Sequence, residues 1–286
     1  MKHTIQAGIA AALLAAPPLL GVATSARAQS VSPDADAGAV TVAEPVEPGA
    51  AGKTRWTVGL GPALVPEYEG SEDYRATLIP VVRAQKDYLY GQLLGLRFRS
   101  NLINDANWRL GPSVRWRRGY SDVSNRRVDD LNNREGSFEI GAAGGYDFTF
   151  GKSAITAGLE FTQDISGGHN GFVVTPALTY RGPLAPRWDF SLNGDFSVAS
   201  GGYMDHYFGV NSRDSRDSGL NEFNADADVK DTSFTVSIGY RFAESWKLQM
   251  LGQYRRMLGD AADSPVVDDE GDPNNLFGGV IVSYTW

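Results

Sequence analysis

The stretch that decides the fold is residues 137–150, SFEIGAAGGYDFTF. Its aromatic and aliphatic side chains, such as Phe138 and Ile140, take alternate positions, and Glu139 and Asp147 fall between them. Alternate side chains of a β-strand point to opposite faces, so one face of this strand is apolar and the other polar. Runs of about ten alternating residues separated by turns are typical of a transmembrane β-barrel. The same alternation recurs over 155–164, 172–181, 188–198, 233–242 and 246–255.

Composition narrows the class of protein. The chain has 286 residues with 33 glycines, 13 phenylalanines, 12 tyrosines, 6 tryptophans and no cysteine. Glycine and aromatic residues are abundant and helix formers such as Lys, Met and Glu are sparse, which favours strands over helices, so we expect an all-β protein. The lack of cysteine excludes disulfides, cysteine-ligated zinc, iron–sulfur clusters and thiol nucleophiles. A net charge of −8 and a pI near 4.9 argue against nucleic acid as a partner, because phosphate neutralisation needs a surplus of Lys and Arg.

The N-terminal region has the features of an export signal. Residues 1–28 contain Lys2, an apolar stretch rich in Ala and Leu, and the sequence Ala26-Arg27-Ala28, which predicts a cleaved signal peptide. An uncleaved membrane anchor is the alternative, and Pro17-Pro18 within a short apolar stretch argues against it. Residues 29–52 have no aromatic or basic side chain, so we expect a disordered acidic leader. The folded domain is then expected to cover 53–286.

The tryptophans distinguish a membrane barrel from a soluble sandwich, which also alternates. They fall on the apolar face, mostly at strand ends, where an interfacial girdle lies in a membrane barrel. We therefore expect a β-barrel in the outer membrane of a Gram-negative bacterium, surrounded by lipid and lipopolysaccharide and inserted by the barrel assembly machinery. The expected girdle residues are Trp56, Trp108, Trp116, Trp188 and Trp246.

Turn lengths predict the orientation and the number of strands. Short connections near 150–153, 181–187 and 243–245 alternate with long ones at 119–136, 201–230 and 259–275. Bacterial barrels have short periplasmic turns, long outer loops and an even number of antiparallel strands. Residues 86–102 are too long for one strand and are interrupted at Gly91 and Gly95, so we interpret them as two short strands. The prediction is a barrel of twelve strands, with ten as the fallback.

The polar face carries many charges of both signs. Charged side chains that cannot reach water must pair, so we interpret them as a network that fills a narrow lumen, with a selective pore as the alternative. The residues expected in this network are Arg97, Arg99, Arg109, Arg115, Arg117, Glu139, Asp147, Glu160, Asp189, Asp195, Arg241 and Arg255.

Several segments together resemble the MipA/OmpV family, the MltA-interacting protein family. They are PEYEGS at 66–71, Gly111-Pro112 with Arg117-Arg118-Gly119, DHYFGV at 205–210, SGL at 218–220, LGDAADSPVV at 258–267 and Phe277-Gly278-Gly279. The resemblance spans 56–286. It implies an outer-membrane barrel and a scaffold that joins a lytic transglycosylase to a penicillin-binding protein, linking murein cleavage to murein synthesis. It implies no catalytic residues.

The end of the chain, VIVSYTW at 280–286, is similar to the C-terminal signal that the outer-membrane assembly machinery reads. That signal usually ends in Phe, and the aromatic Trp286 meets the same interfacial requirement. The residues expected to form the signal are Val280, Val282, Tyr284 and Trp286.

Catalytic and metal-binding chemistry has few candidates. After residue 28 the histidines are His169 and His206, and Asp205 lies beside His206. No nucleophile motif surrounds the serines near them, so we expect no enzyme. The six carboxylates of 259–273 could hold calcium, but their spacing does not match an EF-hand, so we expect a solvated acidic loop and no cofactor. The serines considered as nucleophiles are Ser200, Ser212 and Ser215.

The favoured hypothesis is therefore a non-enzymatic scaffold in the outer membrane. A small-solute, porin-like channel and a surface adhesin that acts through 201–230 are the alternatives. The sequence does not identify the partner-binding residues, the oligomeric state or any ligand of the outer loops.

Overall fold

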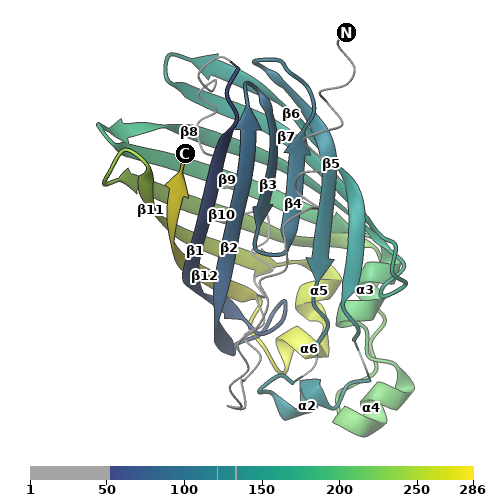
Figure 1. Ribbon diagram of the computed structural model, residues 1–286. Helices are drawn as coiled ribbons and strands as arrows, with labels where there is room; N and C mark the ends of the chain where they lie inside the picture. Colours follow the sequence, from purple (N-terminus) through teal and green to yellow (C-terminus); the bar gives the residue numbers. More distant parts are fainter. Residues whose placement is uncertain (1–51, 121, 133) are drawn as a thin grey trace, which may run out of the picture.

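A computed structural model describes residues 52–286, except 121 and 133. The expected signal peptide and all but the last residue of the expected leader lie outside this range. Within it, antiparallel strands close into a barrel in which each strand pairs with its neighbours in sequence and β1 pairs with β12 (Figure 1). The strands are β1 Arg55–Pro66, β2 Tyr74–Lys86, β3 Leu89–Leu94, β4 Arg97–Asn101, β5 Trp108–Arg117, β6 Ser137–Phe150, β7 Ser153–Asp164, β8 Phe172–Ala185, β9 Trp188–Ala199, β10 Asp228–Arg241, β11 Trp246–Met257 and β12 Asn274–Thr285.

The predicted twelve-strand barrel is confirmed, including the pair of short strands within 86–102. The β3–β4 hairpin turns at Gly95, whose φ of 57° lies in the left-handed region that glycine adopts without strain. The other end of β3 follows Asp87, also at positive φ, in a two-residue turn after β2. Counting β3 and β4 separately makes the total even, as a closed antiparallel barrel requires.

The alternation in 137–150 separates the inside of the barrel from the outside. Ser137 and Glu139 on β6 are fully buried in the lumen, whereas Ile140 and Phe148 are 43% and 55% exposed on the outer wall. Large exposed apolar side chains occur on the outer wall of the other strands too, for example Leu178 on β8. Such a surface is stable only in an apolar medium such as the bilayer interior.

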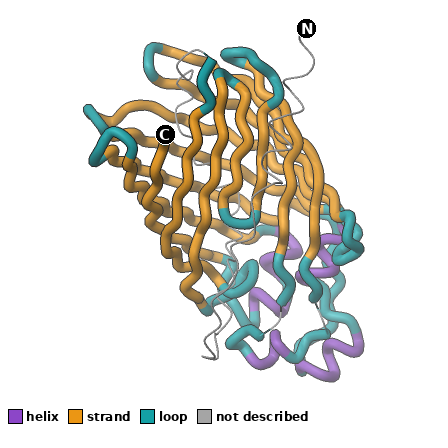
Figure 2. Tube along the Cα trace, viewed as in Figure 1, coloured by secondary structure: helices purple, strands orange, loops and turns teal. Residues whose placement is uncertain are grey.

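The long connections gather at one end of the barrel, and the C-terminus lies toward the other (Figure 1). We expected loops there, but they contain short helices, which Figure 2 shows in purple at that end. Local capping explains them: Asn211 and Asp214 form a capping box, and Ser264 caps a turn that starts with Pro265. The helices are α2 Arg126–Asp129, α3 Gly201–Phe208, α4 Ser212–Ser218, α5 Gly259–Asp263 and α6 Pro265–Asp268.

These helices and the first outer loop, residues 67–73, pack around their own hydrophobic core, and together we call them the cap. Tyr203 and Met204 on α3 are completely buried in this core. In the described residues, none of the helices is long and apolar enough to cross a membrane. The cap core includes Tyr68, Tyr120, Val128, Tyr203, Met204, Tyr207, Phe208, Leu220, Met257, Val266 and Val267.

One sector of the lumen is apolar, which the alternation of charges did not lead us to expect. Side chains from β1, β2, β11 and β12 meet there instead of forming ion pairs. Burying these apolar groups fills that part of the lumen without any polar partner. The cluster comprises Ala63, Val65, Ile79, Val81, Leu251, Phe277 and Ile281.

Candidate functional site in the lumen and mouth of the barrel

Three buried carboxylates organise the charges of the lumen. The first is Glu160 on β7, which accepts hydrogen bonds from Arg97 Nε at 3.1 Å and Arg99 Nε at 3.0 Å, and one from the Ser113 hydroxyl. Arg97 and Arg99 lie on β4 and Ser113 lies on β5, so these contacts tie β7 to strands that do not pair with it. A charge taken out of water is tolerated only when partners of this kind replace its hydration.

The second carboxylate is Asp147, near the end of β6 that lies opposite the cap. It accepts from Arg109 Nε at 2.8 Å and from the Thr156 hydroxyl at 2.6 Å, and it also pairs with Arg181 of β8. Two guanidinium groups from opposite sides therefore share one acid that is 1% exposed. This shared pairing holds β5, β6 and β8 in fixed relation to one another.

The third carboxylate is Glu139, which lies below the cap. Arg117 Nε donates to it at 2.7 Å, and so does the Thr162 hydroxyl at 2.7 Å. His169 completes the group, with Nε2 at 3.1 Å from the carboxylate. His169 Nδ1 accepts a hydrogen bond from the Gly171 backbone N–H, so the ring proton lies on Nε2. Nε2 therefore donates a hydrogen bond to the Glu139 carboxylate.

Glu69 links the cap to the barrel. It belongs to the first outer loop, yet its side chain is only 9% exposed and reaches inward between several cations. Lys230 Nζ lies 2.9 and 3.0 Å from its two oxygens, Tyr203 donates to it at 2.8 Å, and Arg117 lies at 3.2 Å. Arg255 approaches to 3.6 Å. One acid therefore joins loop 67–73, helix α3 and strands β5, β10 and β11.

Ion pairs within the cap hold its outer helices together. Asp214 on α4 accepts from the backbone N–H of Asn132 at 3.0 Å and from Arg134 at 3.3 Å. Burial raises the pKa of Asp214, but the hydrogen bonds from Asn132 and the charge of Arg134 outweigh it, so the pKa is lowered overall. Arg127 on α2 similarly pairs with Glu270, which follows α6. The cap is thus a packed unit with defined contacts.

The two histidines considered as catalytic bases are hydrogen-bonded to groups other than a serine nucleophile. His169 is bound to Glu139 and Gly171 as described, and His206 Nε2 lies 3.0 Å from the backbone carbonyl of Glu135, to which it donates. Burial lowers the pKa of His206, and the nearby Arg134 acts in the same direction. Among the described residues, neither imidazole is hydrogen-bonded to a serine hydroxyl, and Asp205, Ser200, Ser212 and Ser215 do not form a dyad with them.

The acidic segment 259–273 is folded into the cap. Asp260 accepts from the backbone N–H of Asp226, Glu270 pairs with Arg127, and Asp272 accepts from the backbone N–H of Asn274. In the part of the chain that the structure describes, no group of three or more acids or histidines is arranged to hold a metal ion.

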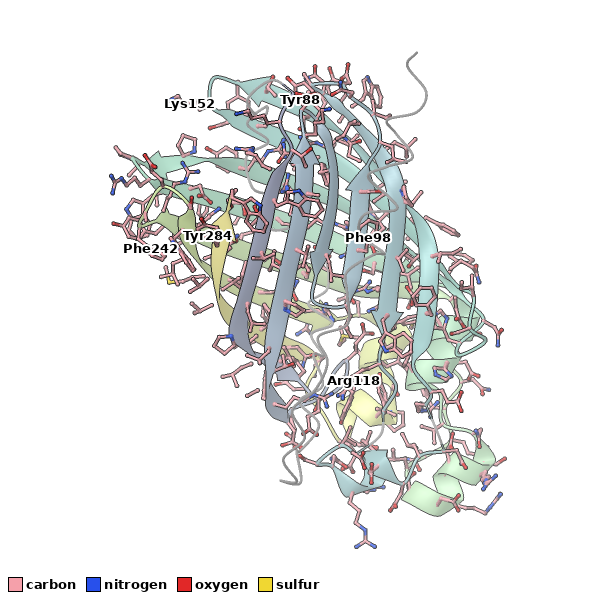
Figure 3. The ribbon with its side chains drawn as sticks, in the orientation of Figure 1. Tyr88, Phe98, Arg118, Lys152, Phe242 and Tyr284 are labelled. Carbon is pink, nitrogen blue, oxygen red and sulfur yellow. The ribbon has the colours of Figure 1, made fainter. Side chains whose placement is uncertain are left out.

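Aromatic side chains lie at both ends of the outer wall. At the end opposite the cap, Trp188 stacks on Tyr240 with ring centroids 4.5 Å apart, and Trp246 meets Tyr284 at 5.0 Å. Figure 3 places Tyr284 at that end together with Tyr88, Lys152 and Phe242. At the cap end, Trp116 lies beside Phe138 at 6.3 Å. The structure thus places Trp108, Trp116, Trp188 and Trp246 on the exposed outer wall and Trp56 half-buried at the β1 end.

The final strand closes the barrel. Trp56 and Trp286 exchange backbone hydrogen bonds at 3.1 and 3.0 Å, which join β1 to the end of the chain. All four residues of the expected assembly signal point outward. Val280, Val282, Tyr284 and Trp286 are 41%, 38%, 36% and 57% exposed.

The expected lumen network needs one correction and several additions. Arg241 lies at the last position of β10 and is exposed, because the strand ends there and the surrounding wall no longer encloses it. Asp189 pairs with Lys247 at 3.0 Å, Asp195 accepts from Ser233, and Arg115 is buried on the lumen side. Glu69 and Lys230 escaped sequence reasoning because they lie at or next to long connections, where no alternation marks the inward face. Only Glu69 had a signal in the sequence, because it lies within the family-like segment 66–71. Lys230 lies in none of the segments that resemble the family.

A closed antiparallel barrel with an apolar outer wall, aromatic residues at both ends and a charged lumen defines an outer-membrane β-barrel protein. The family model described as MltA-interacting protein MipA matches residues 58–286. The chain therefore belongs to the MltA-interacting protein MipA family, and it resides in the outer membrane.

Individual relatives are distant in sequence. The MltA-interacting proteins of Escherichia coli K12 and Shigella flexneri are each 24% identical over 225 residues, which covers 75% of this chain and 84% of theirs. Among solved structures, an outer-membrane channel from Pseudomonas putida F1 is similar with a TM-score of 0.44 and 15% identity, covering 84% of this chain and 100% of that one.

Proposed function

We propose that this barrel is a non-enzymatic scaffold that binds a lytic transglycosylase and a penicillin-binding protein, and so couples cleavage of murein to its synthesis. The observation that carries the proposal is family membership over 58–286, together with curated relatives named for their interaction with MltA. The fold and the family are those of outer-membrane barrel proteins and an interacting protein.

The geometry of the lumen supports a scaffold better than a small-solute channel. Glu160, Asp147 and Glu139 each bind guanidinium groups that would otherwise line a pore. The apolar cluster fills another sector, and Glu69 holds the cap in the mouth. Two cavities below the cap measure about 50 and 10 Å³. Passage of a solute would require several buried ion pairs to break together, each at a cost of several kcal/mol.

The periplasmic end is the side on which murein enzymes work. There the strands are joined by tight turns, such as Gly151-Lys152 between β6 and β7. Figure 3 shows Tyr88 and Lys152 at that end, where Lys152 is exposed and Tyr88 is half-buried. β1 also begins at this end with Arg55. We assign the partner contacts to these turns and to the residues that precede β1.

The test is an affinity pull-down of the full mature protein from mild-detergent outer-membrane extracts, scored by mass spectrometry. Three forms are compared: the wild-type chain, a chain without residues 29–52, and a Lys152→Glu, Tyr88→Ala variant. An Arg126→Glu variant, altered on the opposite end of the molecule, is the matched control. In parallel, the wild-type protein is placed in planar bilayers to record conductance.

We expect the wild-type and Arg126→Glu proteins to recover both enzyme classes specifically. A periplasmic variant should recover less of them, and the wild-type protein should show no discrete conductance. If neither enzyme class is recovered while single-channel steps appear, the scaffold proposal is wrong and the charged lumen is the functional site.

A further inference from the structure

The barrel wall has a notch at the cap end. β3 pairs with β2 only over Val81–Lys86, so no strand covers Tyr74–Pro80 on that side. The tip of the β3–β4 hairpin ends there, with the Gly95 N–H donating to the Pro80 carbonyl at 2.9 Å. Beyond the tip, β2 and β5 are no longer bridged, and the three strand spacings of about 4.8 Å between them leave the two strands roughly 14 Å apart. Figure 2 shows the hairpin turn ending before the outer ends of the long strands beside it.

The notch lies at the level of lipid headgroups. Tyr74 on β2 and Trp116 on β5 flank it, and their side chains are 41% and 52% exposed on the outer wall. Aromatic residues of this kind mark the membrane–water interface. Because the cap end is the outer end, the notch opens toward the outer leaflet.

A cavity of about 50 Å³ lies behind the notch. Arg75 of β2 lines it from one side and Arg117, Arg118 and Gly119 line it from the other, whereas β3 and β4 contribute no lining residue. Figure 3 shows Arg118 beyond the hairpin tip, between the outer ends of β2 and β5. A water molecule needs at least about 10–15 Å³ of this kind of volume, so the cavity holds a group as large as a phosphate.

The lining presents hydrogen-bond donors that lack acceptors. Arg75 donates from Nη2 to the Glu67 carbonyl at 2.7 Å, but its buried Nε has no partner in the described residues. The buried hydroxyl of Tyr120, a residue 5% exposed, likewise has none. Leaving buried donors unpaired is unfavourable, so an acceptor is expected at this site. Arg117 and Arg255 are paired with Glu139 and Glu69, but Arg75 forms no ion pair among the described residues, so its positive charge favours an anionic acceptor.

We propose that the notch binds the phosphate of a phosphorylated glycolipid from the outer leaflet. Arg75 Nε and the Tyr120 hydroxyl donate hydrogen bonds to the phosphate oxygens, and the guanidinium charge strengthens the first of them. The acyl chains lie outside, along the exposed face of β2 that includes Leu78. A headgroup enters sideways through the notch, while the cap closes the route from the outer solvent.

The experiment uses the full mature protein folded in detergent micelles and native mass spectrometry. The probes are bisphosphorylated lipid A, the same lipid with its phosphates removed, and inorganic phosphate. The variants are Arg75→Gln, Arg75→Lys and Tyr120→Phe, and Arg126→Gln is the control because that arginine is 93% exposed on the cap. Heat-modifiable migration on gels shows that each variant is folded.

We expect one bound lipid A per barrel, about tenfold weaker retention in Arg75→Gln and Tyr120→Phe, partial recovery in Arg75→Lys, and no change in Arg126→Gln. Removal of the lipid phosphates should weaken binding to a similar extent. Equal retention by wild type and Arg75→Gln, or equal binding of the dephosphorylated lipid, would overturn the proposal. Binding of inorganic phosphate as tight as that of lipid A would overturn the lipid as its source. If Arg75→Gln does not fold, Tyr120→Phe decides by the same criteria, because it removes only a hydroxyl.

Discussion

Glu69 is the single side chain on which closure of the mouth depends most. Glu69→Ala leaves Lys230 and Arg255 buried beside a missing carboxylate, which we expect to cost the cap about 3–5 kcal/mol. Limited proteolysis should then cut within 201–227 at much lower protease concentration, while the barrel still shows heat-modifiable migration. Glu72→Ala, in the same loop but exposed, is the matched control and should behave as wild type. Equal resistance of both variants to protease would contradict the role given to Glu69.

The direction in which a side chain faces can be tested at Phe234, which is 47% exposed on the outer wall of β10. Phe234→Arg places a charge against lipid, at a cost of roughly 2–4 kcal/mol near the middle of the membrane. Folding into lipid vesicles, followed by gel shift, should be clearly less efficient than for Phe234→Leu, which keeps the position apolar. If the two variants fold equally well, Phe234 does not face the bilayer.

Acid should loosen the cap through His206. Burial holds its pKa below the unfolded value of about 6.5, so the unfolded cap binds the extra proton first as the pH falls. The stability of the cap is therefore complete above about pH 6.5 and declines as the pH drops toward the folded pKa. Hydrogen exchange of α3 between pH 7 and 5 should show this decline, and His206→Gln, which keeps a donor for the Glu135 carbonyl, should reduce it. An unchanged pH dependence in the variant would assign the effect to another group.

At the scale of elements, α3 is the centre of the cap. Met204 is completely buried there, so Met204→Ala should destabilise the cap by about 2–5 kcal/mol through lost contacts and the cavity left behind. The strands of the barrel pair through their own backbone hydrogen bonds, so their stability need not change when the cap is destabilised. Thermal unfolding of the cap can be followed by proteolysis and that of the barrel by gel shift. In Met204→Ala the cap transition should move to lower temperature while the barrel transition stays in place. A single transition shifted as one would show that cap and barrel unfold together.

The strands were predictable from sequence because the bilayer imposes one rule, apolar outside and polar inside, on every residue of a spanning strand. The alternation in 137–150 and the glycine turn at Gly95 therefore indicated both the faces and the strand count. The cap helices have four to eight residues, too few for a helical period to emerge, and their order comes from tertiary packing. The same holds for the site: Glu160 and its arginines follow from alternation, but nothing local makes Glu69 turn inward.

The whole molecule is a closed barrel that presents its cap to the outer surface and its turns to the periplasm. The cap core, the lumen ion pairs and the apolar cluster each occupy part of the interior of the barrel and so narrow any path through it. What remains available to soluble partners is the periplasmic end and the cap surface. The scaffold proposal requires murein enzymes to use the first of these.

The most direct measurement is photo-crosslinking in intact cells, with a photoreactive amino acid placed at Lys152 on the periplasmic side or at Arg126 on the cap. Both side chains are exposed, so the two positions differ mainly in the face that they sample. We predict crosslinks to a lytic transglycosylase from position 152 and none from position 126. Crosslinks to that enzyme from position 126 alone, or from neither position while the pull-down also recovers none, would contradict the account.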